Sequence, residues 1–516
     1  MKRFWVLLLP FLSAAAQSID TSALTGYKTI QSADLRAHLN IIASDSMEGR
    51  EVSFPGQKKA ARYIASVFEK LNLQPIGDDG TYFQHFNVEV RRPDPNSKIF
   101  LTSSGSTTSF SWEKDFIAES VCDTIVSGPA VFLGFPDNEI DDSVKIKLSG
   151  YMAFVFAGKR EFANDTSRAA MLRRLYAFRR ETGIAALFII TDKEGASAFP
   201  SVLTYLRGMN VSKGKMRMSD GKPFELPHSI RYFASWSMAE EVLKSSGLSL
   251  EEIRSKALQS ETFKPVLLPG VKITIQSRVL YETRQTENVV ALLPGSDSRL
   301  KHQAVVFSGH YDHLGKDGNG VIYYGADDDG TGTTTVLELA QAFAQNPVKP
   351  KRSLIFITFT GEEKGLFGSS YYTDHPFLPY DSTIADLNVD MIGRLDPEHE
   401  QHNQSNYTYV IGSDKISLEL DTLLNAANKE TDSMTFDYQY NNENDPEQFY
   451  RRSDHYNFAK HNIPVVFFFT GTHADYHKPG DTVDKILFDR MANIVRLIYD
   501  LGWKLGNLDH LLRKKQ

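Results

Sequence analysis

Cysteine is almost absent from this chain, whose 516 residues include only Cys122. A single cysteine cannot form an internal disulfide, so the fold must be held by a packed core. A chain of this length can bury a large core and has room for more than one domain. Cys122 also lies far from the amino terminus, which excludes it as a lipid-attachment site.

An excess of positive charge is absent as well. The formal net charge is -7, with 41% hydrophobic and 23% charged residues. This composition is typical of a soluble globular protein, and without a basic footprint we expect no nucleic-acid partner. Beyond the first residues no stretch approaches 18 apolar residues, so we expect no stable membrane insertion. Nothing in the sequence indicates an oligomeric state.

The amino terminus has the pattern of a secretory signal peptide. Lys2 and Arg3 precede an apolar run at 4–12, and small residues follow at 13–16. The run is too short to span a bilayer, and the alternative is a buried amino-terminal helix. We expect residues 1–16 to be a signal peptide and the protein to be exported to the periplasm or the extracellular medium.

The chain then divides into three regions. Residues 17–103 predict the amino-terminal part of the main domain, with a helix at 56–73, a strand at 83–90 and a polar loop at 45–50 between its first elements. Residues 104–264 contain short β-rich runs, helical segments and few candidate catalytic residues. This pattern predicts an inserted α+β domain. Residues 265–516 form the main domain.

Apolar strands alternate with helices through the main domain. The strand candidates are 289–293, 304–307, 354–359, 407–411 and 464–469, and the helix candidates are 333–345, 416–429 and 486–505. Nearly continuous apolar strands between helices predict an α/β fold with a mainly parallel mixed sheet flanked by helices. Such folds bind ligands beyond the carboxyl ends of their strands.

Acidic residues and histidines follow these strands repeatedly. One by one they are ordinary surface residues, but together they fall at several strand ends, and three aspartates between glycines at 327–329 add to them. Carboxylates and imidazoles gathered at one edge suit a divalent metal such as zinc. The candidates are His310, Asp312, Asp328, Glu362, Glu363, Asp390 and His477.

Five sequence blocks resemble a known family: HYDHLG, GADDDGTG, FTGEEKGLFGS, NVDMIGR and YHKPGDT. Their order and spacing are similar to those of the co-catalytic di-zinc metallopeptidases, which include bacterial leucyl aminopeptidases, glutamate carboxypeptidase and glutaminyl cyclases. The resemblance covers residues 27–103 and 271–516. Residues 104–264 resemble a protease-associated domain, an insertion that recurs in this family.

The resemblance implies a site with two Zn²⁺ ions. His310 and Asp390 would hold one zinc, Glu363 and His477 the other, and Asp328 would bridge them. Asp312 resembles the carboxylate that orients the imidazole of His310, and Glu362 resembles the general base. Tyr476, beside His477, is a candidate for polarising the substrate carbonyl or the oxyanion, although a tyrosine that merely packs beside a ligand is equally ordinary.

Two further motifs are weaker. Ser453-Asp454-His455 contains the residue types of a hydrolase triad, but consecutive residues do not form a relay and no GxSxG motif exists. The resemblance places this stretch near the site as a structural loop. His399-Glu400-Gln401-His402 narrowly misses the HExxH zinc motif, and we interpret it as a surface loop.

The resemblance therefore implies an exported zinc exopeptidase that acts on peptides. It favours an aminopeptidase that removes amino-terminal residues with a hydroxide held by two zinc ions. A carboxypeptidase or dipeptidase of the same family is an alternative, whereas a glutaminyl cyclase fits less well because those enzymes work with one zinc. A catalytically inactive receptor or binding protein on this scaffold is also open, but all the ligand positions are intact.

Overall fold

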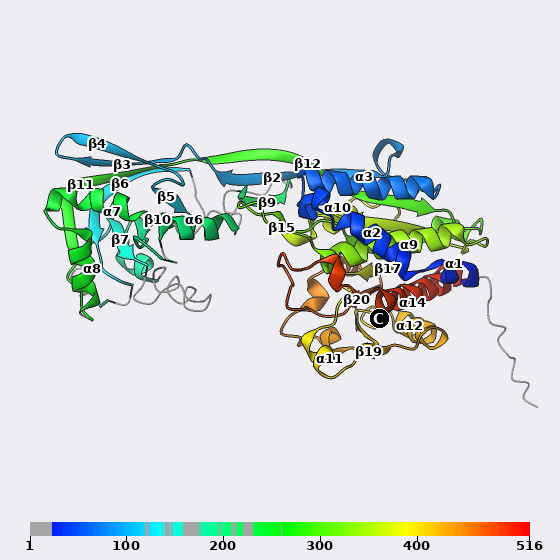
Figure 1. Ribbon diagram of the computed structural model, residues 1–516. Coiled ribbons are helices and arrows are strands. Elements are labelled where there is room, and N and C mark those ends of the chain that lie inside the picture. The colour runs from blue at the N-terminus through cyan, green and yellow to red at the C-terminus, as the bar shows by residue number, and fades with distance from the viewer. Residues whose placement is uncertain are drawn as a thin grey trace, which may run out of the picture.

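The computed structural model describes residues 23–515 except 119–122, 137, 140–144, 146–147, 158–174, 176, 196–197, 209–212, 220–230 and 260. The predicted signal peptide and Cys122 lie outside the described residues. Two lobes, each built around its own sheet, are joined by a long two-stranded ribbon (Figure 1).

The larger lobe contains a 10-stranded sheet. Its strand order is β19 (Thr435–Asp437), β18 (Tyr407–Ile411), β20 (Val465–Phe469), β17 (Thr383–Val389), β13 (Ala304–His310), β16 (Ser353–Phe359), β12 (Val279–Leu293), β2 (Phe83–Pro93) and β9 (Lys215–Met218), with β1 (Gln74–Pro75) beside β12.

The centre of this sheet is parallel and its flanks contain antiparallel pairs. Strands β20, β17, β13 and β16 pair in parallel, whereas β12 joins β16 and β2 in antiparallel fashion. The central strands are buried along their whole length. Their apolar sequences follow because both faces of the sheet are covered. The predicted α/β fold with a mixed sheet flanked by helices is confirmed.

Helices cover both faces of the large sheet. One face carries α1 (Leu24–Thr29), α2 (Ser32–Ile42), α3 (Pro55–Lys70), α9 (Gly332–Gln345), α12 (Leu418–Glu430) and α14 (Phe488–Asn507). The other face carries α10 (Phe367–Asp374) and α13 (His455–Lys460).

Alternation along β13 divides the core between these two faces. Val305 and Phe307 join the cluster under α9 and α14, while Val306 joins the cluster under α13. Successive side chains of a strand point to opposite faces, so a run of apolar residues serves both. Helix α14 approaches closely because it has Gly502 at the contact, where a Cβ would lie 2.4 Å from the ring of Phe307.

The smaller lobe contains an eight-stranded sheet with a separate core. Its order is β4 (Ser106–Ser111), β3 (Lys98–Ser103), β11 (Val266–Ser277), β6 (Thr124–Phe132), β7 (Met152–Phe156), β8 (Ala186–Ile190), β10 (Arg231–Ala234) and β5 (Phe116–Ala118). Helices α6 (Phe199–Gly208), α7 (Trp236–Leu243) and α8 (Leu250–Leu258) accompany it.

This lobe corresponds to the predicted inserted domain, 104–264. Its sheet also takes in β3 and β11, which lie at 98–103 and 266–277, outside that interval. The division of the chain into domains stays a prediction.

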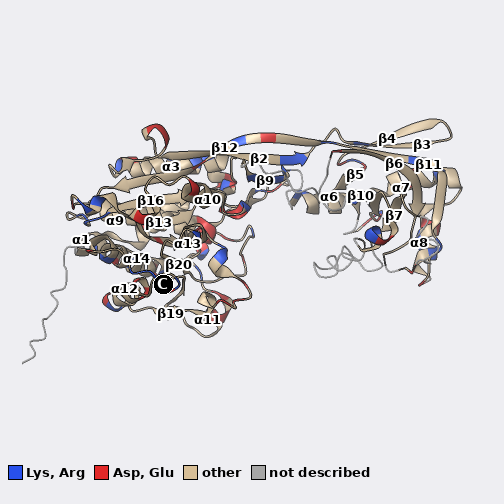
Figure 2. Cartoon of the chain, turned by 180° about the vertical axis from the view of Figure 1, so that it is seen from behind, with Lys and Arg blue, Asp and Glu red and all other residues tan. Residues whose placement is uncertain are grey.

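The ribbon between the lobes consists of β2 and β12, which pair from Phe83 and Val289 to Pro93 and Val279. Charged residues occur along it (Figure 2), and Glu282 forms an ion pair with Arg284 at 2.9 Å. The inserted region returns to the large sheet through β9, which pairs with β2 at the sheet edge.

The HExxH-like stretch differs from its predicted surface loop. Pro397–Gln401 is a short helix, α11, because Asp396 caps its amino end and Pro397 occupies the first turn. His399 is buried, with its ring 3.4 Å from that of Tyr407. No helix in the described part of the chain is long and apolar enough to cross a membrane.

Candidate metal centre

Four neighbouring strands position the candidate ligands at one edge of the large sheet. His310 is the last residue of β13, Asp390 directly follows β17, Glu363 follows β16, and His477 lies in the loop after β20. These strands run in parallel, so their carboxyl ends meet. Asp328 joins them from the turn that precedes α9.

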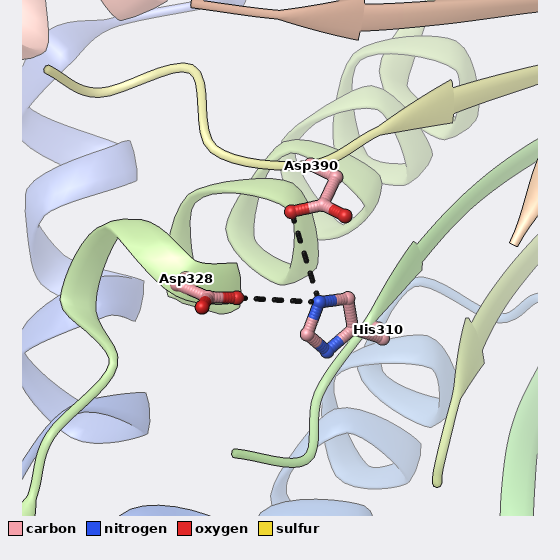
Figure 3. Close-up of side chains that lie close together, drawn as sticks. All are labelled: His310, Asp328 and Asp390. Atoms are coloured by element: carbon pink, nitrogen blue, oxygen red, sulfur yellow. Dashed lines mark ion pairs between the residues drawn. The ribbon is translucent and has the colours of Figure 1, made fainter. Parts of the chain in front are cut away.

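The first cluster combines one imidazole and two carboxylates (Figure 3). Nε2 of His310 lies 3.5 Å from Oδ1 of Asp328 and 3.7 Å from Oδ1 of Asp390. All three residues are buried. The side chains converge from β13, from the turn before α9 and from the end of β17.

The second cluster shares Asp328 with the first. Nε2 of His477 lies 3.1 Å from Oδ2 of Asp328 and 3.1 Å from Oε2 of Glu363. Asp328 therefore directs one carboxylate oxygen to each cluster. The structure brings together all five residues that the sequence proposes as ligands.

His313 belongs to this cluster and was missed from the sequence. Its Nδ1 lies 2.7 Å from Oε1 of Glu363 and 3.8 Å from Oδ2 of Asp328, and its side chain is fully buried. A second histidine three residues after His310 was the available signal. In a loop of irregular backbone, however, spacing does not predict side-chain direction.

The donor set fits zinc. Zinc lies about 2.0–2.2 Å from nitrogen and oxygen ligands, so two ligands of a tetrahedral ion are about 3.3 Å apart. The ligand atoms of the two clusters are 3.1–3.7 Å apart. His310 Nε2, Asp328 Oδ2 and Glu363 Oε1 are buried without a hydrogen-bond partner. Buried polar atoms need partners, and a cation would supply one.

The charges of the second cluster hold its groups ionised. Burial lowers the pKa of His477, but Asp328 and Glu363 outweigh it and raise that pKa to about 10, so a metal bound there would displace a proton from the imidazole. Burial and Asp328 raise the pKa of Glu363, but His313 and His477 outweigh them and lower it to about 2. Glu363 is therefore a carboxylate at neutral pH, the form that binds metal.

Glu362 belongs to neither cluster, unlike its neighbour Glu363. Its Oε2 lies 3.8 Å from Nε2 of His310, and the residue lines the open pocket. Burial, with Asp390 and Glu363, raises the pKa of Glu362 well above its ordinary value, against the opposing charge of His310. A carboxyl group with a raised pKa can take up and release a proton near neutral pH.

Asp312 contacts both sides of the site. Nδ1 of His310 lies 3.1 Å from the carbonyl oxygen of Asp312 and 3.6 Å from its Oδ1. The same Oδ1 accepts a hydrogen bond from the backbone N–H of Glu362 at 3.2 Å. Asp312 thus links the loop after β13 to the loop after β16.

The other two aspartates of the 327–329 cluster bind backbone rather than the ligand groups. Asp329 accepts hydrogen bonds from the N–H groups of His310 and Met391, both at 3.1 Å. Asp327 accepts from the N–H of Gly393 at 2.6 Å and lies 3.3 Å from Nε2 of His473. These contacts fix the strand ends from which ligands project.

A buried arginine that the sequence placed in a polar loop supports the same turn. Arg50 is fully buried and donates to the carbonyl oxygens of Ile42, Tyr311, Tyr324 and Gly325. The guanidinium of Arg50 also lies near several buried carboxylates. Arg50 thereby ties the carboxyl end of α2 to the loops of the candidate metal centre.

The Ser-Asp-His stretch lies beside the site. The hydroxyl of Ser453 donates to Oδ2 of Asp390 at 2.7 Å, which leaves Oδ1 facing His310. The ring of His455 stacks on Phe467, 4.7 Å between centroids. This stretch orients a candidate ligand, Asp390, and packs against β20.

A pocket opens onto the clusters. It encloses about 350 Å³ of empty space, part of it open to solvent. Tyr476 lies on its wall with its ring stacked on His477 at 3.9 Å, and burial raises the pKa of its phenol. The lining residues are Asp328, Glu362, Asp390, Met391, Phe449, Arg452, Phe467, Phe469, Thr472, Tyr476 and His477.

Known proteins are similar in sequence to part of this chain. The chain is 28% identical over 249 residues to leucine aminopeptidase 2 of Arthroderma otae, covering 43% of this chain and 45% of that protein. It is 32% identical over 148 residues to a probable zinc metalloprotease of Pyricularia oryzae, covering 28% of each. The chain thus spans less than half the length of these curated relatives.

The fold resembles an aminopeptidase from Aneurinibacillus sp. strain AM-1. The TM-score is 0.52 at 18% identity, over 95% of this chain and 97% of that one. Residues 288–502, which contain every candidate ligand, match the model described as Peptidase family M28. Over residues 288–502 the chain is therefore similar to peptidase family M28.

Proposed function

We propose that this protein is an exported zinc exopeptidase, an aminopeptidase that removes amino-terminal residues from peptides with two zinc ions. The observation that carries the proposal is Asp328, whose two oxygens face separate clusters beside an open pocket. Support also comes from the Peptidase family M28 match and from relatives named leucine aminopeptidase. The predicted signal peptide at 1–16 supports export.

We assign each zinc a distinct set of ligands. His310 and Asp390 would hold one ion, Glu363 and His477 the other, with Asp328 between them. When bound, such a metal pair favours ionisation of water and polarises the scissile carbonyl. His310 and Asp390 lie at the ends of β13 and β17, whereas Glu363, His477 and Asp328 lie in the adjoining loops and turn.

Glu362 is the proposed general base. It lines the pocket without belonging to either ligand set, so its carboxylate is free for proton transfer. It would accept a proton from the attacking water and return it to the departing amine. Burial raises the pKa of Tyr476, so its phenol stays protonated and can donate a hydrogen bond to the developing oxyanion.

Two substrates of opposite polarity test the reaction type. Leucyl-p-nitroanilide has a free amino group and no carboxylate, whereas an amino-blocked peptide with a free carboxyl terminus has the reverse. The proposal predicts zinc-dependent hydrolysis of the first. Turnover of the blocked peptide alone would favour a carboxypeptidase, and absence of both zinc and turnover would favour a binding protein.

A further inference from the structure

Arg452 lines the same pocket as the candidate metal ligands Asp328, Asp390 and His477. In the described part of the chain, it is the only lysine or arginine among the lining residues. Its guanidinium carbon lies 4.6 Å from the ring centroid of Phe449. The neighbouring residue, Ser453, is bound to Asp390, so Arg452 is anchored next to a ligand-bearing segment.

The polar contacts of Arg452 are weak and exposed. Nη1 lies 3.5 Å from the carbonyl oxygen of Glu447 and 3.4 Å from its carboxylate. The side chains of Arg452 and Glu447 are 39% and 61% exposed. Exposed ion pairs of this kind contribute little free energy, so the guanidinium can exchange Glu447 for another carboxylate.

The other residues that line the pocket include a group of carboxylates and a group of apolar side chains. Carboxylates of Asp328, Glu362 and Asp390 lie at the metal end, and bound zinc would neutralise most of their charge. Apolar side chains form another part of the wall, namely Met391, Phe449, Phe467 and Phe469.

We infer that Arg452 determines specificity by binding a carboxylate of a short peptide substrate. This inference rests on the proposed function and narrows its substrate class. Arginine presents a planar fork of donors that matches a carboxylate, and the Phe449 ring holds that plane. The carboxylate belongs either to the carboxyl terminus of a short peptide or to an acidic side chain.

Matched substrates separate these two sources. Leucyl-glycine is compared with leucyl-glycinamide, which lacks only the terminal carboxylate. Glutamyl-p-nitroanilide is compared with glutaminyl-p-nitroanilide, which lacks only the side-chain carboxylate. Leucyl-p-nitroanilide, with no carboxylate, reports the basal reaction.

The variants are Arg452→Gln, Arg452→Lys and the control Arg451→Gln. Arg451 is an exposed neighbour that does not line the pocket, and its substitution makes the same change in net charge. Zinc content of each variant is measured, because Ser453 adjoins the substitution.

The expected result is a loss confined to one carboxylate substrate. Arg452→Gln should lower kcat/KM about tenfold for either leucyl-glycine or glutamyl-p-nitroanilide, mainly through KM, as for a lost charge-assisted hydrogen bond. Its uncharged partner and leucyl-p-nitroanilide should change less than twofold. Arg452→Lys should retain part of the preference, and Arg451→Gln all of it.

Equal kcat/KM losses for charged and uncharged partners, or no loss for either, would overturn the inference. These results differ from failure of the proposed function itself. In that case the wild-type protein with zinc hydrolyses neither leucyl-p-nitroanilide nor the dipeptides.

Discussion

Nδ1 of His313 lies 2.7 Å from Oε1 of Glu363, while the other oxygen of that carboxylate, Oε2, lies 3.1 Å from Nε2 of His477. Glu363 thus lies between two imidazoles, with one carboxylate oxygen close to each. Partners of this kind orient a ligand and tune its affinity for the metal.

Replacing His313 should weaken zinc binding at the second cluster. Loss of an outer partner typically costs 10–100-fold in metal affinity, so we expect His313→Ala to weaken one zinc by about that factor. His313→Asn, which keeps a donor near Nδ1, should lose less. Competition with a chromophoric chelator measures both affinities.

His302→Ala is the matched control, because His302 is exposed and remote from the clusters. It should bind both zinc ions as the wild type does. Unchanged zinc affinities in His313→Ala would show that the contact with Glu363 has no role in metal binding.

Glu362→Gln should abolish most turnover and keep the metal. The amide fills the same space but cannot accept the proton, and loss of a general base typically costs 10²–10⁴-fold. Zinc content, measured by elemental analysis, should stay at the wild-type value. A kcat near wild type would refute the assignment.

Asp328→Ala should disturb both clusters together. The substitution removes an oxygen from each and leaves the remaining buried groups without a shared partner. We expect lower occupancy of both zinc ions and a lower unfolding temperature, whereas Asp390→Ala should affect one ion first. Full occupancy in Asp328→Ala by elemental analysis would contradict its bridging position.

The parts of the site at strand ends were predictable from sequence. His310, Glu363 and Asp390 directly follow apolar runs, and parallel strands bring such residues to one edge. The positions of His313 and Arg50 were not predictable, because the direction of a side chain in an irregular loop depends on tertiary contacts. The roles of Glu362 and Glu363 were assigned from the resemblance of the five sequence blocks, because spacing alone does not distinguish these two residues.

The fold, like the site, was predictable from the sequence only in part. Apolar runs predicted the central strands, but strand β9 pairs with β2, which lies more than a hundred residues earlier in the chain. Its sequence, Lys-Met-Arg-Met, carries little strand signal. Pairing of such a short edge strand is decided by tertiary packing, here of Met216 and Met218 against the cluster at Phe367.

Glu338 should make stability depend on pH at a place remote from the metal ligands. It is buried in α9, where its Oε1 accepts the N–H of Gln31 at 3.2 Å. Burial raises the pKa of Glu338 from 4.5 to about 8. The folded state therefore keeps a proton that the unfolded state loses, and stability falls as pH rises from 4.5 to 8.

Glu338→Gln removes the ionisable carboxyl group and keeps a side-chain oxygen that can accept the N–H of Gln31. Thermal unfolding should show a variant similar to wild type near pH 5 and more stable at pH 9, by about 5 kcal/mol at most. Glu69→Gln, at an exposed position of α3, is the control. Equal stability differences at both pH values would show that Glu338 is ionised in the fold.

The most direct test of the central claim is a zinc titration of the metal-free protein, followed by hydrolysis of leucyl-p-nitroanilide. Asp328 between two ligand sets predicts that activity rises with added zinc and levels off at two equivalents. Full activity without zinc, or activity that is complete at one equivalent with no second ion bound, would contradict the account.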